Sequence, residues 1–512
     1  MYFARVLSPL CGLLLYGAAT IAPAATAALP AAAAAPTVTV KGGVLRGAEL
    51  GGTQVFLGIP YAAPPLGALR WRAPQAAAAW SGARDATQYG AACTQGEDRF
   101  FGLTPKVRSE DCLYLNVWAP PHAAAPLPVM VWLHGGAHRI GTAAIASYDG
   151  GALARRGVVV VTLNYRLGYL GYFAHPALAA EGKAGNFGLL DQIAALRWVQ
   201  DNIAAFGGDP QRVTVFGESA GGADILYLLT SEAGYGLFQQ AIVESGGGWG
   251  KPLPREKMQK KVVAALETIG VAQDANAAAL RALPAEKLIT AQAGDRNLGF
   301  GPFIDGDSVF EAPARVIAEG RQMKVPLIIG SNDWEGSLLK FRKPGFMDQV
   351  LTRLPAVSGW YEGQADNAEA RQPLLFRDIV FAAPARWVAT QHSAQAPAWL
   401  YRFAHVSASR RGQVPGAGHA AEIAYVFDTL DSLKVFGSTV DDDDRKLAAT
   451  LADCWVAFAK TGAPRCAPAW AAHGAQADTL LLIDGTAHEV KTPDAAALDG
   501  VTKYFGPGGW LD

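Results

Sequence analysis

The pentapeptide Gly217-Glu-Ser-Ala-Gly221 has the spacing of a nucleophile elbow, the sharp turn that exposes a reactive serine at the end of a strand. It follows the apolar run Val213–Phe216 and precedes the apolar pattern Ile225–Leu229, so the serine would lie between a strand and a helix. Glycines two residues before and after the serine let such a tight turn avoid clashes with neighbouring backbone. The pattern predicts that Ser219 is a nucleophile able to attack an ester carbonyl.

A second glycine-rich motif, His134-Gly-Gly-Ala137, directly follows the apolar run Val129–Leu133. Backbone N–H groups of such a loop can converge on one point and stabilise the negatively charged oxygen of a tetrahedral intermediate. We expect these donors from Gly136 and Ala137, with a third from Ala220 after the nucleophile. The alternative is an ordinary glycine turn at the end of a strand.

A serine nucleophile needs a histidine base and a carboxylate that orients it, and in α/β-hydrolases these follow the serine in the order acid, then histidine. Asp333 and Glu335 both follow the apolar run Pro326–Ile329, and position alone does not separate them. Among the later histidines, His419 lies in a glycine-rich loop after an expected strand, which favours it as the base. His405, at a strand end, is more typical of a packing residue.

The elements that would position these residues are short, uninterrupted apolar runs that alternate with helical patterns. Strands that are apolar on both faces belong to a sheet covered by helices on each side. We therefore expect an α/β-hydrolase fold, with a doubly wound, mostly parallel sheet and helices on both faces. The runs are 129–133, 158–161, 213–216, 241–243, 326–329, 399–403 and 480–483.

Three further segments complete the expected architecture. The alternating stretches Thr37–Val40 and Gln54–Leu57 are expected to pair as an antiparallel lead-in hairpin. The pattern over Asn186–Ala205 predicts a helix that ends at two glycines. Between Lys251 and Arg321 lies an alanine-rich helical insertion, which we expect to form part of the wall over the active site.

Residues 1–28 have the pattern of a cleaved signal peptide, with Arg5, an apolar stretch over Val6–Ala19 and small residues after it. A membrane anchor is the alternative, but the apolar run is short for a membrane span. Residues 29–36 form an Ala/Pro-rich lead-in, and no linker divides residues 37–512, which we expect to form one domain. The protein is expected to be secreted or periplasmic, with no stable membrane insertion after cleavage.

If the protein is exported, its cysteines are expected to form disulfides. Cleavage would remove Cys11 and leave Cys93, Cys112, Cys454 and Cys466 in an oxidising compartment. Three pairings are possible, and closeness along the chain favours Cys93–Cys112 and Cys454–Cys466.

The charge distribution limits the classes of partner. A formal net charge of −1 gives no electrostatic reason to expect nucleic acid or an anionic membrane. The acidic run Asp441–Asp444 is interpreted as the start of a helix rather than a calcium site. The chain has no Cys-x-x-Cys pair and no Cys/His cluster typical of zinc, and the chemistry above needs neither metal nor cofactor. The oligomeric state stays open.

Several longer motifs make the chain resemble the type-B carboxylesterases, the family that includes the cholinesterases. The resemblance runs from about Gly42 to the C-terminus, and its two longest motifs are highly specific. They are Phe206–Gly222 around the serine and Glu110–Trp118, with shorter matches at Gly58–Ala62, Pro64–Gly67 and Asn164–Gly168.

The resemblance implies a serine hydrolase that acts on a small-molecule ester, and it selects between the two carboxylates. The acid of the family occupies an Asn-x-x-Glu-Gly pattern, which here places Glu335 ahead of Asp333. Its histidine occupies a His-x-x-Glu pattern, which matches His419 and Glu422.

The resemblance also assigns supporting roles. Glu422 and Ser245 would lie near the histidine, and Glu218 would lie beside the nucleophile. The Cys93–Cys112 pairing matches a disulfide of the family, whereas Cys454–Cys466 rests on spacing alone.

One departure from the family concerns substrate choice. Many members have an aromatic residue after the oxyanion motif, where this chain has His138-Arg139. A guanidinium near the acyl-binding side would suit a carboxylate, so Arg139, with His138, is a candidate for recognising esters that carry an anionic group. The alternative is that Arg139 pairs with a structural carboxylate. A binding protein of the same fold and an enzyme that prefers amides or thioesters are the rival functions.

Overall fold

A computed structural model describes the part of the chain on which the following sections rest. The expected signal peptide and residues 29–34 of the lead-in lie outside the described residues. The described residues are 35–98, 104–121, 124–182, 184–294, 300–342, 347–348, 350, 359–361, 365, 367–466 and 469–507.

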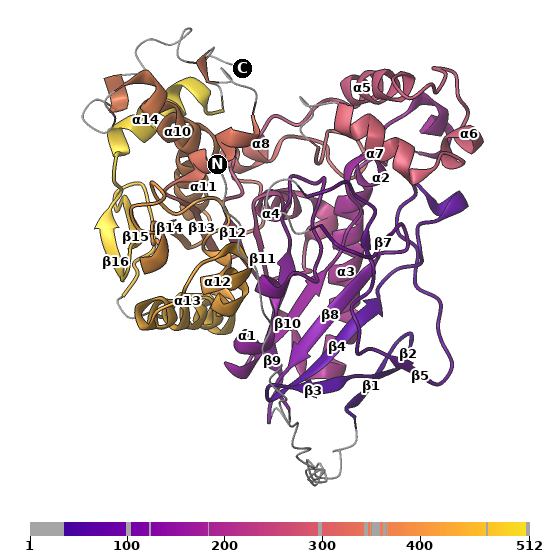
Figure 1. Ribbon diagram of the computed structural model, residues 1–512, viewed down its shortest axis with the longest axis horizontal. Helices are drawn as coiled ribbons and strands as arrows, with labels where there is room; N and C mark the ends of the chain where they lie inside the picture. Colours follow the sequence, from indigo (N-terminus) through magenta and orange to yellow (C-terminus); the bar gives the residue numbers. More distant parts are fainter. Residues whose placement is uncertain are drawn as a thin grey trace, which may run out of the picture. The chain divides into compact units, whose positions relative to one another are not determined.

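The compact unit Pro36–Asp512 is built around a large sheet (Figure 1). Within the described residues this sheet has 11 strands, parallel in its centre and antiparallel at both ends. In spatial order the strands are β16 (Ala487–Lys491), β15 (Thr479–Ile483), β14 (Ala398–Phe403), β13 (Leu327–Asn332), β12 (Gln240–Glu244), β11 (Gly208–Glu218), β9 (Leu127–Leu133), β10 (Val159–Leu163), β8 (Tyr114–Ala119), β4 (Thr53–Pro60) and β3 (Ala48–Leu50).

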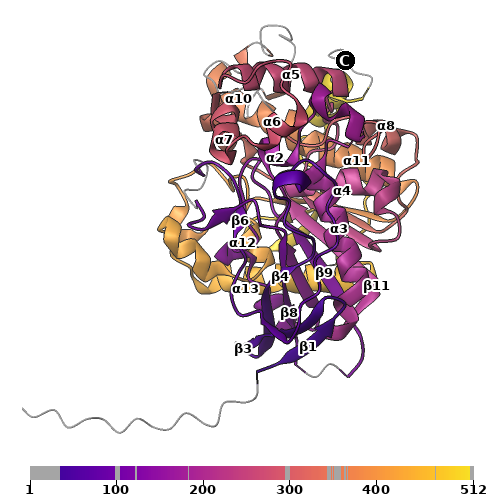
Figure 2. The ribbon, with the colours of Figure 1, turned by 90° about the vertical axis from the view of Figure 1, so that its right-hand side faces the viewer.

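Helices cover both faces of this sheet, as the apolar runs predict. In Figure 2, α3 and α4 lie on one side of the sheet and α12 and α13 on the other. The helices are α1 (Gly151–Arg155), α2 (Gly168–Gly171), α3 (Phe187–Asn202), α4 (Ala220–Thr230), α5 (Arg255–Glu267), α6 (Ala277–Arg281), α7 (Ala285–Gly294), α8 (Pro313–Ala318), α10 (Ala368–Arg377), α11 (Ala383–Ser393), α12 (Ile423–Val426), α13 (Asp442–Thr461) and α14 (Ala495–Phe505).

Each face has its own hydrophobic core. Leu196 of α3 and Ile225 of α4 belong to one buried cluster, and Trp455 of α13 belongs to the other. The central strands contribute side chains to both clusters, because neighbouring residues of a strand point to opposite faces. Val131 faces the first cluster and Trp132 the second. The strands thereby hold the loops at their carboxyl ends in fixed positions.

The helix expected over 186–205 is present as α3, which continues as a 3₁₀ turn to Phe206 and ends at Gly207 with φ of 79°. The expected helical insertion is also present, as α5, α6 and α7. These helices pack with α2 around a separate buried cluster that includes Leu170, Met258 and Leu288, and they lie together at the upper right of Figure 1.

The expected pairing of the two lead-in stretches is wrong. Strand β1 (Thr37–Val40) pairs with β2 (Gly43–Arg46), and β2 also pairs with β5 (Ala83–Asp85) in a sheet of its own. Strand β4 instead pairs with β3 and β8 of the main sheet. The physical reason is local, because glycine turns close each hairpin within a few residues. Gly51 and Gly52, between β3 and β4, have φ of 57° and 80°.

The acidic run 441–444 begins α13, as interpreted. The Asp441 side chain accepts from the backbone N–H groups of Asp443 and Asp444. In turn, the Asp444 side chain accepts from the Asp441 N–H. This reciprocal capping box satisfies N–H groups that lack a partner within the helix.

Both expected disulfides are present, Cys93–Cys112 and Cys454–Cys466, each with a Cα–Cα distance of 4.9 Å. Cys93 and Ala92 form β6, which pairs with the two-residue strand β7 (Arg108–Ser109). Among the described residues, no helix combines the length and apolar composition needed to cross a membrane.

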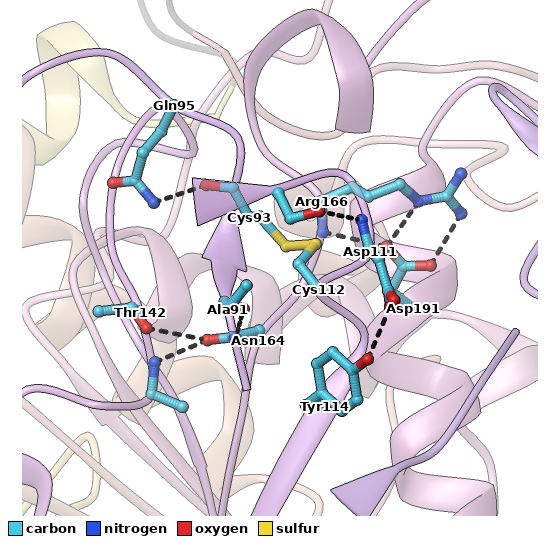
Figure 3. The surroundings of a disulfide bond; sticks show 12 residues. Ala91, Cys93, Gln95, Asp111, Cys112, Tyr114, Thr142, Asn164, Arg166 and Asp191 are labelled. Atoms are coloured by element: carbon cyan, nitrogen blue, oxygen red, sulfur yellow. Dashed lines mark hydrogen bonds and ion pairs between the residues drawn. A yellow bond between two sulfur atoms is a disulfide. The ribbon is translucent and has the colours of Figure 1, made fainter. Parts of the chain in front are cut away.

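Figure 3 shows the buried polar network around Cys93–Cys112. Asn164 Oδ1 accepts from the Thr142 hydroxyl at 3.2 Å, and Arg166 makes two 2.8 Å bonds to Asp191. Gln95 donates to the carbonyl of Gly141 and accepts from its N–H, both at 2.8 Å. This network therefore supports the end of the loop that follows β9.

Candidate active site

Ser219 lies at the turn between β11 and α4, with φ of 55° and ψ of −118°. A positive φ is rare for a residue with a side chain, and here it marks the strained turn of a nucleophile elbow. A Cβ on Gly217 would lie 2.7 Å from the Leu133 carbonyl oxygen, and a Cβ on Gly221 would overlap the same carbonyl. Close packing against β9 therefore requires glycine at both positions.

The loop after β9 lies against this elbow. A Cβ on Gly135 would come within 3.1 Å of Ser219 Cβ. Gly136, Ala137 and His138 have φ of 107°, 54° and 55°, so three successive residues with positive φ reverse the loop. The turn is closed by the N–H groups of the next two residues, which both donate to the Gly136 carbonyl.

The backbone donors expected to bind an oxyanion are not used elsewhere. Within the described residues, the N–H groups of Gly136, Ala137 and Ala220 donate to no protein acceptor. Backbone donors that have no protein partner beside Ser219 are suited to a negative charge that develops on a bound substrate.

His419 lies in the loop before α12, and its Nδ1 is 2.6 Å from Glu335 Oε2. The fully buried Glu335 accepts two further bonds on Oε1, from the Ser245 hydroxyl at 2.5 Å and from the Asn332 N–H at 2.9 Å. Asp333 instead accepts from the Ala417 N–H at 2.7 Å. The structure thus brings Glu335, and not Asp333, to the imidazole.

The other ring nitrogen of His419 faces a second carboxylate. His419 Nε2 lies 3.0 Å from Glu218 Oε1. Burial by itself would lower the pKa of His419, but Glu218 and Glu335 outweigh it and raise that pKa well above its ordinary value. Within the described residues, no hydrogen bond joins the Ser219 hydroxyl to the imidazole. Such bonds are often formed only once substrate is bound.

Two more buried carboxyl groups lie behind the histidine. Glu422 accepts from Asn332 Nδ2 at 2.5 Å, and burial together with the nearby Glu218 and Glu335 raises the pKa of Glu422 to about 8. Glu244 accepts from Trp455 Nε1 at 2.8 Å, and its pKa is raised mainly by burial and then by Glu422.

Glu244 was not among the residues expected from the sequence. The available signal was a carboxylate at the end of the apolar strand β12, directly before Ser245. In the sheet Glu244 lies opposite Glu218 of β11, which places both at the edge where the catalytic loops begin.

Two cavities flank the site. One, of about 430 Å³, lies along α4 one helical turn after Ser219, and its lining includes Ala223, Lys251 and Lys261. The other, of about 670 Å³, is lined mainly by apolar residues and includes Trp334 and His419. The larger cavity is thus lined in part by His419, and the smaller one lies beside the helix that follows Ser219.

The two residues after the oxyanion motif are both engaged by the protein. Arg139 Nη2 donates to the Gln292 carbonyl at 2.9 Å, and its guanidinium lies 5.2 Å from the centre of the Phe300 ring. His138 contacts Asp224 and the Phe300 carbonyl. The contacts of Arg139 hold its guanidinium against the segments that carry Gln292 and Phe300.

Comparisons with known proteins agree with this geometry. The model of the "Carboxylesterase family" matches residues 34–350 and 348–498. A para-nitrobenzyl esterase of Bacillus subtilis (strain 168) is 38% identical over 470 residues, which cover 87% of this chain and 94% of that protein. A fumonisin B1 esterase of Sphingopyxis macrogoltabida is 38% identical over 83% of this chain and 82% of its own length. A solved PNB esterase superposes with a TM-score of 0.82 at 36% identity, covering 91% of this chain and 99% of that one.

Proposed function

Because the chain belongs to the carboxylesterase family and is a carboxylic ester hydrolase, we propose that Ser219, His419 and Glu335 form its catalytic triad. The observation that carries the proposal is the 2.6 Å contact of His419 with the fully buried Glu335, beside a serine held in the strained turn of an elbow. No cofactor is required for this chemistry.

In the first half of the reaction, Ser219 attacks the ester carbon while the neutral form of His419, with Nε2 unprotonated, takes the hydroxyl proton. Glu335 fixes the tautomer through Nδ1 and stabilises the imidazolium that forms. Glu218, 3.0 Å from Nε2, adds a second negative charge beside this cation. The carbonyl oxygen becomes an oxyanion, which the N–H groups of Gly136, Ala137 and Ala220 bind.

Collapse of this intermediate gives an acyl-enzyme on Ser219, and the imidazolium of His419 donates its proton to the departing alcohol. Water then attacks the acyl carbon with His419 as general base, and the acid is released. The residues that hold the triad are Ser245 and Asn332, whose bonds to Glu335 occupy its second oxygen. Glu422 and Glu244 lie behind them as buried, protonatable groups.

The decisive test is Ser219→Ala. It should abolish labelling by a fluorophosphonate probe and reduce ester turnover by more than the ~10²–10³-fold that the loss of one oxyanion donor costs. Ser231→Ala, the same change at the other end of α4, is the matched control. Substantial esterase activity in purified Ser219→Ala protein would contradict the assignment.

The same triad could also serve amides or thioesters. Turnover of an ester and an amide with identical acyl groups decides between these activities, and we expect the ester to react faster.

A finer proposal concerns esters that carry an anionic group. The 430 Å³ cavity begins one turn after the nucleophile, and two of its lining residues, Lys251 and Lys261, are cationic. Lys251 and Lys261 are therefore better candidates for binding an anionic group than Arg139, whose guanidinium packs on Phe300. The test compares kcat/KM for a neutral diester with kcat/KM for the matching half-ester. This ratio should rise in favour of the neutral diester in Lys251→Met and Lys261→Met. The same pair of substrates applied to Arg139→Met tests the earlier hypothesis.

We also propose that the enzyme acts outside the cytoplasm, either secreted or periplasmic. Two disulfides support this proposal, because such bonds persist in oxidising compartments. The mature chain would then consist of the single domain 37–512 with a short lead-in before it.

A further inference from the structure

His138, the first residue after the oxyanion motif, is buried and held from three directions. Its Nε2 lies 2.9 Å from Asp224 Oδ1, and its Nδ1 lies 3.1 Å from the Phe300 carbonyl oxygen. Its own carbonyl accepts from the Gly168 N–H at 2.7 Å. Gly301 permits the approach of the Phe300 segment, since a Cβ there would come within 2.9 Å of Nδ1.

Both ring nitrogens of His138 have hydrogen-bond partners. A backbone carbonyl can only accept a hydrogen bond, so Nδ1 must carry a proton. Asp224 is fully buried and also accepts from Gln192 Nε2 at 2.5 Å on its other oxygen. One hydrogen bond joins His138 Nε2 to Asp224 Oδ1, and Asp224 Oδ2 is occupied by Gln192, so the side chains of His138 and Asp224 are fixed against each other.

This pair joins two parts of the active site that are 86 residues apart in the chain. His138 directly follows Ala137, a proposed oxyanion donor. Asp224 lies on α4, whose N-terminus carries Ser219. The contact with the Phe300 carbonyl adds a segment of the helical insertion that follows α7. The contact between these two side chains therefore links the loop that carries the proposed donors to the helix that follows Ser219.

We propose that His138 and Asp224 form a hydrogen-bonded clamp that positions the oxyanion loop against the helix carrying Ser219. His138 is a positioning residue in this proposal, which rests on the triad and oxyanion hole proposed above. An oxyanion hole is effective only when its donors are fixed where the charge develops, so a loosened loop should weaken the transition state more than substrate binding.

The test uses His138→Gln, Asp224→Asn and the double variant of the full chain. The kcat and KM for a p-nitrophenyl ester are measured with the inhibition constant of a trifluoromethyl ketone, which adds to a serine and places an oxyanion in the hole. We expect each single variant to lose roughly 10- to 100-fold in kcat, less than the ~10²–10³-fold for a donor removed outright, with a similar loss of inhibitor affinity and a smaller change in KM. The double variant should be no worse than the poorer single one, because the two residues act as one unit.

Control variants separate positioning from stability. His392→Gln alters another buried histidine, which contacts the Val325 carbonyl, and should lower the thermal midpoint without a selective loss of kcat. Single variants that keep kcat and inhibitor affinity would overturn the clamp. It would also be overturned if the fold-loss of kcat in the double variant equalled the product of the losses in the two single variants. If the single variants do not fold, His138→Leu/Asp224→Leu removes both polar groups together, a change that buried pairs often tolerate. Full kcat and inhibitor affinity in that protein would also overturn the proposal. Retained turnover in Ser219→Ala would instead indicate that the triad itself is wrong.

Discussion

At the scale of single residues, the chemistry depends on which of two neighbouring carboxylates contacts His419. Glu335→Gln should lower kcat by on the order of 10³–10⁴-fold, the effect of losing the acid from such a triad. The amide keeps the shape of the side chain but no longer stabilises the imidazolium. Asp333→Asn, which keeps an oxygen for the Ala417 N–H, is the matched control and should have a much smaller effect. The reverse ranking in steady-state kinetics would contradict the choice of Glu335.

A second residue-scale prediction concerns Glu422 and pH. Burial and the neighbouring carboxylates raise its pKa from an ordinary 4.5 to about 8. Between these values Glu422 is ionised in the unfolded chain and protonated in the folded one. Folding therefore takes up a proton, and the free energy of unfolding contributed by Glu422 falls as the pH rises from about 5 to about 8.

The variant Glu422→Gln does not titrate, so its stability should fall less steeply over this range. Urea unfolding of both proteins at several pH values measures the difference. Other titrating groups, such as His419, contribute to the slope of both proteins, so the difference between the two slopes reports on Glu422. Equal slopes would mean that Glu422 is ionised in the folded protein.

At the scale of elements, α13 is anchored at both ends. Its N-terminus is capped by Asp441, and Cys454 in its C-terminal half is bonded to Cys466 beyond the helix end. Closing a loop of 12 residues should stabilise the fold by about 3 kcal/mol, mainly by restricting the unfolded chain. Replacing both cysteines with Ala should lower the free energy of unfolding by that amount in urea titrations. An unchanged midpoint would show that α13 does not need the bond.

At the scale of the whole molecule, we expect export of the chain and formation of its two disulfides to occur together. Protein recovered from the periplasm or medium should lack residues 1–28, or a segment of similar length, and should contain both disulfides. Intact-mass measurement and non-reducing peptide mapping check the two expectations. Leu14→Arg, which interrupts the apolar stretch 6–19, should keep the chain in the cytoplasm. Export of that variant, or an unprocessed N-terminus on exported wild type, would contradict the signal peptide.

Much of the architecture follows from the sequence because its signals are local. Uninterrupted apolar runs require strands that are buried on both faces, and these runs became the parallel centre of the sheet. The glycines of 217–221 and 134–136 indicated tight turns after two of these strands. Each turn depends on the size and φ of a few consecutive residues, so no distant partner was needed to identify it.

What only the tertiary structure decided are the contacts between residues far apart in the chain. From position alone Asp333 and Glu335 were equivalent, and before the structure only the family resemblance favoured Glu335, whose bond to His419 spans 84 residues. The lead-in stretches had the right strand character but the wrong partners, because strand pairing depends on which neighbours the fold supplies. His138 and Glu422 were expected near the site, but no local signal indicated that His138 would contact Asp224 or that Glu422 would lie near Glu244. A buried charge is stable only beside a partner, and the partner is known only once the chain has folded.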